Sequence, residues 1–256
     1  MNKLAAAALV AIATSSLWAI QGTISTETDR KSGDIKWQGR QKSYLLTYKK
    51  GNTNLQMEFP LDSVTSLEIA KPAGFDKAVE MVQKGQGSGA IPVLDKIVKE
   101  YKMLHWDKPA GRYLVEAYLA ANRADDAYKA AQNIIMEDKA AAYSGELAPA
   151  YWQTLLKLGK SQQLETCLKK AVTTGDRAAS AEALLVRGDM VINQAGETPE
   201  ALRQALTDAY LRVALMYLDE PCRQVRADAM MRCASCFDKL GMAARAETMR
   251  SQAKAL

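Results

Sequence analysis

His105 is the residue best suited to do chemistry in this chain, because it is the only histidine among 256 residues. A histidine-based metal cluster needs a second imidazole, and a nucleophile activated by a histidine base would have to use His105 itself. His105 lies beside Trp106 where a predicted helical unit ends, a place typical of a packing or turn residue. The sequence therefore predicts no metal site, no cofactor and no catalytic residue, and we expect that the protein is not an enzyme. Scattered Asp and Glu residues leave a carboxylate-based hydrolase as the alternative.

Two of the four cysteines, Cys233 and Cys236, have the spacing of a thiol redox motif. Such a motif follows a strand and opens a helix, whereas these two residues fall inside a predicted helix. Cys233 lies next to Ala234, where two helices are predicted to cross, so a buried small apolar side chain is expected. The alternatives are a structural disulfide involving Cys222 or Cys236, which export permits, and redox or metal function. The sequence leaves the bonding state of Cys167 open.

Two further patterns suggest phosphate or nucleic-acid binding. The glycine-rich stretch 85–89 lacks the Lys-Ser or Lys-Thr that completes a phosphate-binding loop, so it predicts a flexible turn. The basic pair Lys49-Lys50 lies near the aromatic residues Trp37 and Tyr44, a combination that can bind single strands. The aromatic residues alternate as core residues do, so we expect no nucleic-acid partner.

The first residues predict an export signal. The positively charged start, residues 1–3, precedes an apolar run over residues 4–13 and then a more polar stretch, the three-part plan of a secretory signal peptide. We expect residues 1–19 to be removed by cleavage after Ala19. An uncleaved anchor is the alternative, but about ten apolar residues are fewer than the roughly 20 that span a bilayer. No cysteine precedes Cys167, so the expected product is periplasmic or secreted, not lipid-anchored and not membrane-spanning.

Residues 20–72 predict a small β domain. Gly51-Asn52 suits the positive φ angles of a tight hairpin turn. Apolar and aromatic residues alternate with polar ones on both sides of that turn: Ile35 and Trp37; Tyr44, Leu46 and Tyr48; Leu55, Met57 and Phe59. Five short strands in about 50 residues resemble the Sm-like or Src-homology-like barrels, in which closure removes exposed edges.

Helical periodicity begins after Lys71-Pro72-Ala73-Gly74 and continues over residues 73–256. The residue that opens the second helix of each unit returns every 37 residues, with one longer step of 45: Ala90, Ala127, Leu164, Ala209 and Ala246. The matching first-helix positions are Ala78, Val115, Trp152, Gly188 and Ala234, and the matching turns are Gly85, Asn122, Gly159, Gly196 and Gly241. A period of 20 to 50 residues is typical of a repeat protein.

This pattern resembles the tetratricopeptide repeat (TPR). The resemblance implies a mainly α fold, a helix-turn-helix solenoid of about five TPR-like units preceded by the small five-stranded β domain. The chain departs from the family in its period, which is about 34 residues there, and in Leu164, which replaces a small residue. The fourth unit carries eight extra residues near Gln194 to Gln204. Thr198-Pro199-Glu200 predicts a fresh helix start there, giving either a longer helix pair or an extra turn of helix.

The resemblance also implies a function. TPR-like arrays bind proteins in a concave groove lined by the first helix of each unit, which here would contain Arg112, Glu116, Gln153, Lys157, Asn193, Ser235, Asp238 and Lys239. An ordinary solvated helix face is the alternative for each of these residues. We expect a non-enzymatic protein-binding scaffold of the bacterial cell envelope, with envelope proteins or the cell-wall polymer as partners. The alternative is a permanent structural subunit of an envelope or outer-membrane assembly complex. The formal charge of +5, with both signs interspersed, is compatible with anionic partners.

Overall fold

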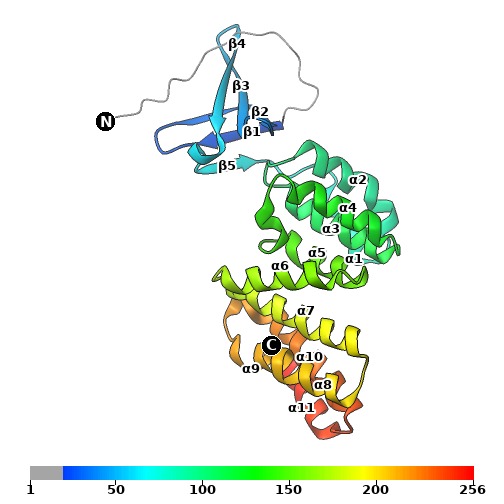
Figure 1. Ribbon diagram of the computed structural model, residues 1–256. Coiled ribbons are helices and arrows are strands. Elements are labelled where there is room, and N and C mark those ends of the chain that lie inside the picture. Colours follow the sequence, from blue (N-terminus) through cyan, green and yellow to red (C-terminus); the bar gives the residue numbers. More distant parts are fainter. Residues whose placement is uncertain (1–19) are drawn as a thin grey trace. The chain divides into compact units, whose positions relative to one another are not determined.

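The computed structural model describes residues 20–256, which form an antiparallel sheet followed by paired helices (Figure 1). The predicted export signal lies outside the described residues and stays a prediction. Contacts divide the chain into two compact units. The first extends to Asn122 and includes Gln132–Asp138, and the second contains Arg123–Ala131 and Lys139–Leu256.

The sheet contains the five predicted strands. Their bounds are β1 Ile20–Ser25, β2 Arg30–Gln38, β3 Ser43–Lys50, β4 Thr53–Pro60 and β5 Ser66–Ile69. The predicted turn at Gly51-Asn52 is confirmed, since Lys50 pairs with Thr53 and Gly51 has a φ of 63°.

The predicted barrel is wrong, because the sheet is open. Its strand order is β4-β3-β2-β1-β5, all antiparallel, so β4 and β5 form the two edges. β5 has only four residues. The Ile69 carbonyl of β5 accepts a hydrogen bond at 3.1 Å from the indole of Trp106, a residue of the helical region. The short β5 edge is therefore partly occupied by a side chain from outside the sheet.

The apolar face of the sheet is completed by a residue from the helical region. Its core contains Ile24, Ile35, Tyr44, Leu46 and Phe59 together with Leu104, which is 1% exposed. Leu104 lies in the segment between the helices Gly87–Glu100 (α2) and Asp107–Ala120 (α3). Strand gives way to helix between Ile69 and Phe75. The sheet core includes Leu104, with Tyr101 and Met103 packed against it.

The helices follow one another as consecutive pairs. The bounds are α1 Phe75–Gln83 and α2 Gly87–Glu100; α3 Asp107–Ala120 and α4 Ala124–Ile135; α5 Leu147–Lys157 and α6 Ser161–Thr173; α7 Arg177–Ala195, then α8 Pro199–Ala205 and α9 Leu211–Met216; α10 Arg223–Lys239 and α11 Ala243–Lys254. Short 3₁₀ turns occur at Leu61–Ser63, Lys139–Ala142 and Glu220–Cys222. The predicted fold class is confirmed: a mainly helical chain of consecutive helix pairs after a five-stranded sheet.

The five predicted turns all have the backbone that ends a helix. Gly85, Asn122, Gly159, Gly196 and Gly241 have φ angles of 76°, 55°, 65°, 71° and 75°, the left-handed region that favours glycine and tolerates asparagine. The residues predicted to open the second helices are 0% or 1% exposed. Ala90, Ala127, Leu164 and Ala246 therefore pack as the repeat pattern requires. Ala209 is buried too, but it lies in the π-helical stretch Leu206–Tyr210 inside its helix and does not open it, so that prediction is wrong.

The irregular fourth pair contains a π-turn. Thr198 accepts a hydrogen bond from the Ala201 amide at 3.2 Å, so the predicted helix start is confirmed. From Pro199 the chain stays helical to Met216, and residues Leu206–Tyr210 form the π-turn between α8 and α9. The extra residues therefore lengthen the pair.

None of the described helices combines the length and apolar character that crossing a bilayer requires.

Candidate functional site

Two predicted groove residues, Arg112 and Glu116, lie one turn apart on α3. The Arg112 Nε donates to Glu116 Oε1 at 2.9 Å, and the guanidinium lies 5.5 Å from the centre of the Tyr113 ring. Both side chains are partly exposed. The structure thus brings these two predicted residues together as an ion pair.

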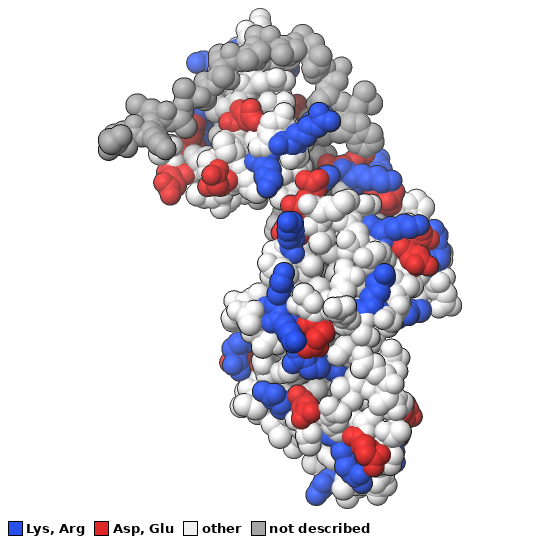
Figure 2. Space-filling model, viewed as in Figure 1, with Lys and Arg blue, Asp and Glu red and all other residues white. Residues whose placement is uncertain are grey.

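The other six predicted groove residues belong to the second compact unit. Gln153 is half-buried and Lys157 is exposed on α5, and Asn193 is exposed near the end of α7. Ser235, Asp238 and Lys239 are exposed on α10. Asp238 pairs with Arg250 of α11, and Lys239 pairs with Glu197. Figure 2 shows both signs of charge intermixed on the face in view. A single groove containing all eight residues stays a prediction.

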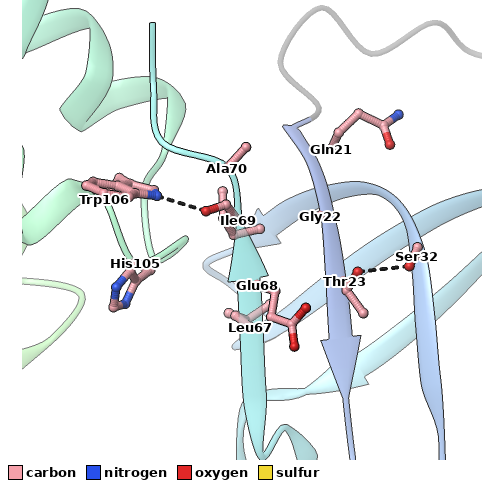
Figure 3. A pocket seen from close by; sticks show the side chains of 10 residues that line it. All are labelled: Gln21, Gly22, Thr23, Ser32, Leu67, Glu68, Ile69, Ala70, His105 and Trp106. Carbon is pink, nitrogen blue, oxygen red and sulfur yellow. Dashed lines mark hydrogen bonds between the residues drawn. The ribbon is translucent and has the colours of Figure 1, made fainter. Parts of the chain in front are cut away.

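His105 lies in a segment between α2 and α3 that sequence reasoning did not single out as a site. It is exposed and has a φ of 76°, and Met103 has a φ of 57°, an uncommon backbone for residues other than glycine. The imidazole packs edge-on against Trp106 at 5.9 Å. A cavity of about 680 Å³ lies beside these two rings, along β5, β1 and β2 (Figure 3). The predicted turn role of His105 agrees with this geometry.

A second cavity, of about 390 Å³, also borders this segment. Its lining contains apolar and aromatic, basic and acidic side chains: Tyr44, Leu61, Leu67 and Met103; His105 and Lys108; Asp107, Glu137 and Asp138. All of these residues belong to the first compact unit. We call it the Asp107 cavity.

Asp107 is the first residue of α3 and is 2% exposed. Its Oδ2 accepts the Met103 amide at 2.8 Å. Its Oδ1 is the one buried side-chain polar atom without a hydrogen-bond partner among the residues that the structure describes. Burial raises the pKa of the Asp107 carboxyl, against the lowering effects of the Met103 amide and of Lys108. A buried acceptor of this kind is costly unless a donor reaches it.

The neighbouring carboxylates already have cations. Glu137 Oε1 lies 2.6 Å from the Lys102 ammonium and Oε2 accepts the Trp37 indole at 3.3 Å. Lys102 and then the Trp37 indole hold the pKa of Glu137 below its usual range. Asp138 Oδ2 lies 2.5 Å from the Lys108 ammonium.

Tyr44 places its hydroxyl between the sheet and this segment. The hydroxyl donates to the Met103 carbonyl at 3.0 Å. Burial, together with the negative charges of Asp107 and Asp138, raises the pKa of Tyr44 to about 12. Tyr44 is therefore a neutral donor that fixes the segment, and the cavity remains rich in acceptors.

Sequence reasoning missed the Asp107 cavity for a physical reason. An aspartate in the first turn of a helix is ordinary, because it complements the helix dipole. Its burial arises from the sheet residues that pack around Met103 and Leu104, a long-range contact with no local pattern. Glu137 and Asp138 are half-buried, follow α4 and are brought in from farther along the chain.

A partly buried polar cluster occupies the second unit. The Tyr210 hydroxyl donates to Asp189 Oδ1 at 2.7 Å, and Arg232 donates to both carboxylate oxygens at 2.9 and 3.2 Å. Every member has a partner, so the cluster holds α7, the π-turn and α10 together.

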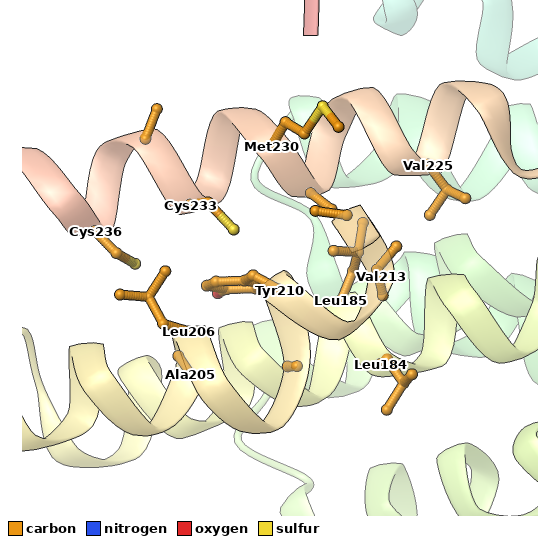
Figure 4. Packing of buried hydrophobic residues seen from close by; sticks show 14 of the residues in the cluster. Leu184, Leu185, Ala205, Leu206, Tyr210, Val213, Val225, Met230, Cys233 and Cys236 are labelled. Carbon is orange, nitrogen blue, oxygen red and sulfur yellow. The ribbon is translucent and has the colours of Figure 1, made fainter. Parts of the chain in front are cut away.

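The four cysteines are buried free thiols, as expected for core residues, and the disulfide alternative is wrong. Figure 4 shows Cys233 and Cys236 on α10 beside Tyr210 and Leu206. Burial raises the pKa of Cys233 to about 12 and that of Cys236 to about 11. Within residues 20–256 no group of three or more His, Cys, Asp or Glu side chains is arranged to hold a metal ion.

No protein-family model matches this chain, and no curated protein matches it. Among solved structures, it is similar to nearly identical TPR-like repeats of a protein described as a kinesin light chain from Podosopora anserina. A variant of that protein gives 13% identity, 72% coverage of this chain, 92% of the other and a TM-score of 0.46. A second structure of those repeats gives 14% identity and 0.43 with the same coverage. BtubC from P. vanneervenii gives 15% identity, 72% and 88% coverage and 0.41.

Proposed function

We propose that this protein is a non-enzymatic protein-binding scaffold that uses the first helices of its helical pairs. One observation carries the proposal. On α5 and α10 the exposed polar side chains of Lys157 and Ser235 alternate with fully buried ones such as Trp152 and Ala234. The polar side chains thus project from a backbone that the core holds in place, and preorganised polar groups lower the cost of binding.

The cell-envelope context belongs to this proposal. It is supported by the predicted export signal and by the mildly basic composition, with a formal charge of +5. The partners would be envelope proteins or the cell-wall polymer, met in the periplasm or outside the cell.

The test is crosslinking in cells followed by identification of attached proteins. Charge reversal of Arg112 and Lys157, to glutamate, should remove specific crosslinked partners because it reverses the partly exposed Arg112 and the exposed Lys157 on first helices. The matched control reverses Lys96 and Lys169, which are 70% and 71% exposed on the second helices α2 and α6. An unchanged set of crosslinked partners in the Arg112 and Lys157 variant would overturn the proposal that the first helices bind the partner.

A permanent structural subunit is the second candidate, and a specific observation favours it. Leu215, Met216 and Leu218 are 58%, 62% and 63% exposed at the end of α9. Adjacent exposed apolar side chains are typical of interaction surfaces. Replacing these three residues by serine should release the protein from a large envelope complex on gel filtration of cell extracts. If the unsubstituted protein already elutes as a monomer, the result favours the protein-binding scaffold over the structural subunit.

A further inference from the structure

The Asp107 cavity combines an apolar wall with one uncompensated acceptor. Leu61, Leu67 and Met103 supply the wall. Asp107 also lines the cavity, is only 2% exposed, and has a buried Oδ1 without a hydrogen-bond partner. A ligand that fits must therefore be apolar along its length and a hydrogen-bond donor at its tip.

The charges around the cavity favour a cationic donor. Glu137 and Asp138 are matched by Lys102 and Lys108, each at 2.6 Å or less. Asp107 is the carboxylate of the lining that has no cation in direct contact, since the nearby Lys108 ammonium pairs with Asp138. An arriving positive charge would restore the ionised form that burial disfavours.

The geometry of the acceptor selects among cations. Oδ2 of Asp107 is already engaged by the Met103 amide, which leaves Oδ1 alone. A guanidinium binds a carboxylate best through two parallel hydrogen bonds, whereas an ammonium is a point charge that one oxygen can accept. The single unpaired oxygen therefore suits an ammonium better than a guanidinium.

We infer that the Asp107 cavity binds the lysine side chain of a protein ligand, with the methylenes against the apolar wall and the ammonium on Asp107 Oδ1. This inference rests on the proposed protein-binding function and names one anchor of the partner. It uses residues distinct from Arg112 and Lys157, so the two proposals fail separately.

The only histidine provides the measurement. His105 lines the cavity, so its single imidazole Cε1–H resonance in the proton NMR spectrum reports ligand entry without further assignment. The full chain is titrated with acetyl-Gly-Lys-Gly-amide and, in parallel, with the norleucine, arginine and acetyl-lysine versions. The lysine peptide should shift the resonance in a saturable way and the norleucine and acetyl-lysine peptides should not. Equal shifts with norleucine would overturn the ammonium site, and tighter binding of the arginine peptide would overturn the single-oxygen geometry.

Asp107→Asn keeps the shape and removes the charge. It should weaken lysine-peptide binding by about tenfold or more, the usual effect of losing a charged hydrogen bond. Asp95→Asn is the matched control, because it removes the same charge from an ion pair on α2, 2.6 Å from Lys99. Circular dichroism establishes that both variants are folded. Wild-type affinity in Asp107→Asn would overturn the inference. Binding of n-butylamine as tight as that of the peptide would overturn a protein lysine as the source.

Discussion

The first turn of α3 is covered although it contains an aspartate, because Met103 and Leu104 draw the preceding segment against the sheet. The Asp107 carboxyl then loses most of its hydration, and only one of its oxygens has a protein donor. Burial of this kind raises the pKa of a carboxyl, as it does here. The residue therefore weakens the fold at neutral pH, which is typical of positions kept for binding.

The pH dependence of stability should reveal this cost. Because the folded-state pKa of Asp107 is raised, the folded protein binds the proton more tightly than the unfolded chain does. The cost is fully present above the folded pKa and disappears as the pH falls through that value. Asp107→Asn removes this cost. The free energy of unfolding of the variant, relative to that of the wild type, should therefore increase as the pH rises from 4 to 8. Urea unfolding at several pH values measures the gap. A gap that stays constant with pH contradicts the assignment.

The cysteines should be inert toward alkylation in the folded protein. Cys233 and Cys236 are 0% and 3% exposed, and burial raises their pKa values to about 12 and 11. At pH 8 a pKa near 11 leaves about one thiolate in a thousand, and thiolate is the reactive form. Intact mass after N-ethylmaleimide treatment should show neither of these thiols modified. In urea all four should react, which also counts them as free.

At the scale of elements, the fourth helical pair shows how a spacing produces a local defect. Its buried positions return as adjacent pairs every four residues: 201 and 202, 205 and 206, 209 and 210, 213 and 214. An α-helix advances 3.6 residues per turn, so a four-residue spacing drifts around the helix by about 40° per repeat. The π-turn at Leu206–Tyr210 takes more residues per turn and absorbs part of this drift. The core face thus stays continuous from Ala201 to Ala214.

Gly188 should be indispensable for this packing. A Cβ at Gly188 would lie 2.4 Å from Tyr210 Cε1 and 3.0 Å from the Ala209 Cβ. Gly188→Ala should therefore destabilise the protein by about 1–3 kcal/mol through overpacking, against the usual helical gain of up to about 1 kcal/mol. Gly89→Ala is the control, since its Cβ would meet only the flexible end of Met81. Chemical denaturation compares the two, and equal stability changes would contradict the close approach.

How much the sequence predicted can be judged from these elements. The turns at Gly85, Asn122, Gly159, Gly196 and Gly241 were predicted because a left-handed helix end needs particular residues locally. The cap at Thr198 was predicted for the same reason. The π-turn was missed although the four-residue spacing indicated it. The open sheet and the Asp107 cavity could not be predicted, because both depend on contacts of Leu104 and Trp106 with strands far away in the sequence.

At the scale of the whole molecule, a core substitution should destabilise the compact unit that contains it and leave the other unit stable. In repeat proteins each element is stabilised chiefly by its neighbours, so damage stays local. Leu104 belongs to the sheet core and Phe237 to the core of α10 and α11 with the fourth pair. Truncation of either buried side chain to alanine should cost about 2–5 kcal/mol.

Amide hydrogen exchange measured on both variants tests this locality. Leu104→Ala should speed exchange in β1–β5, because it removes the residue that completes their apolar face, and should leave α10 and α11 protected. Phe237→Ala should do the reverse, because Phe237 packs in the cluster that contains Cys233 and Ala246. The two variants are expected to lose similar free energies of unfolding, so each serves as the control for the other. Faster exchange across both units in either variant would show a single cooperative fold, and the sheet would then be stabilised by the entire helical array instead of by Leu104 and its immediate neighbours.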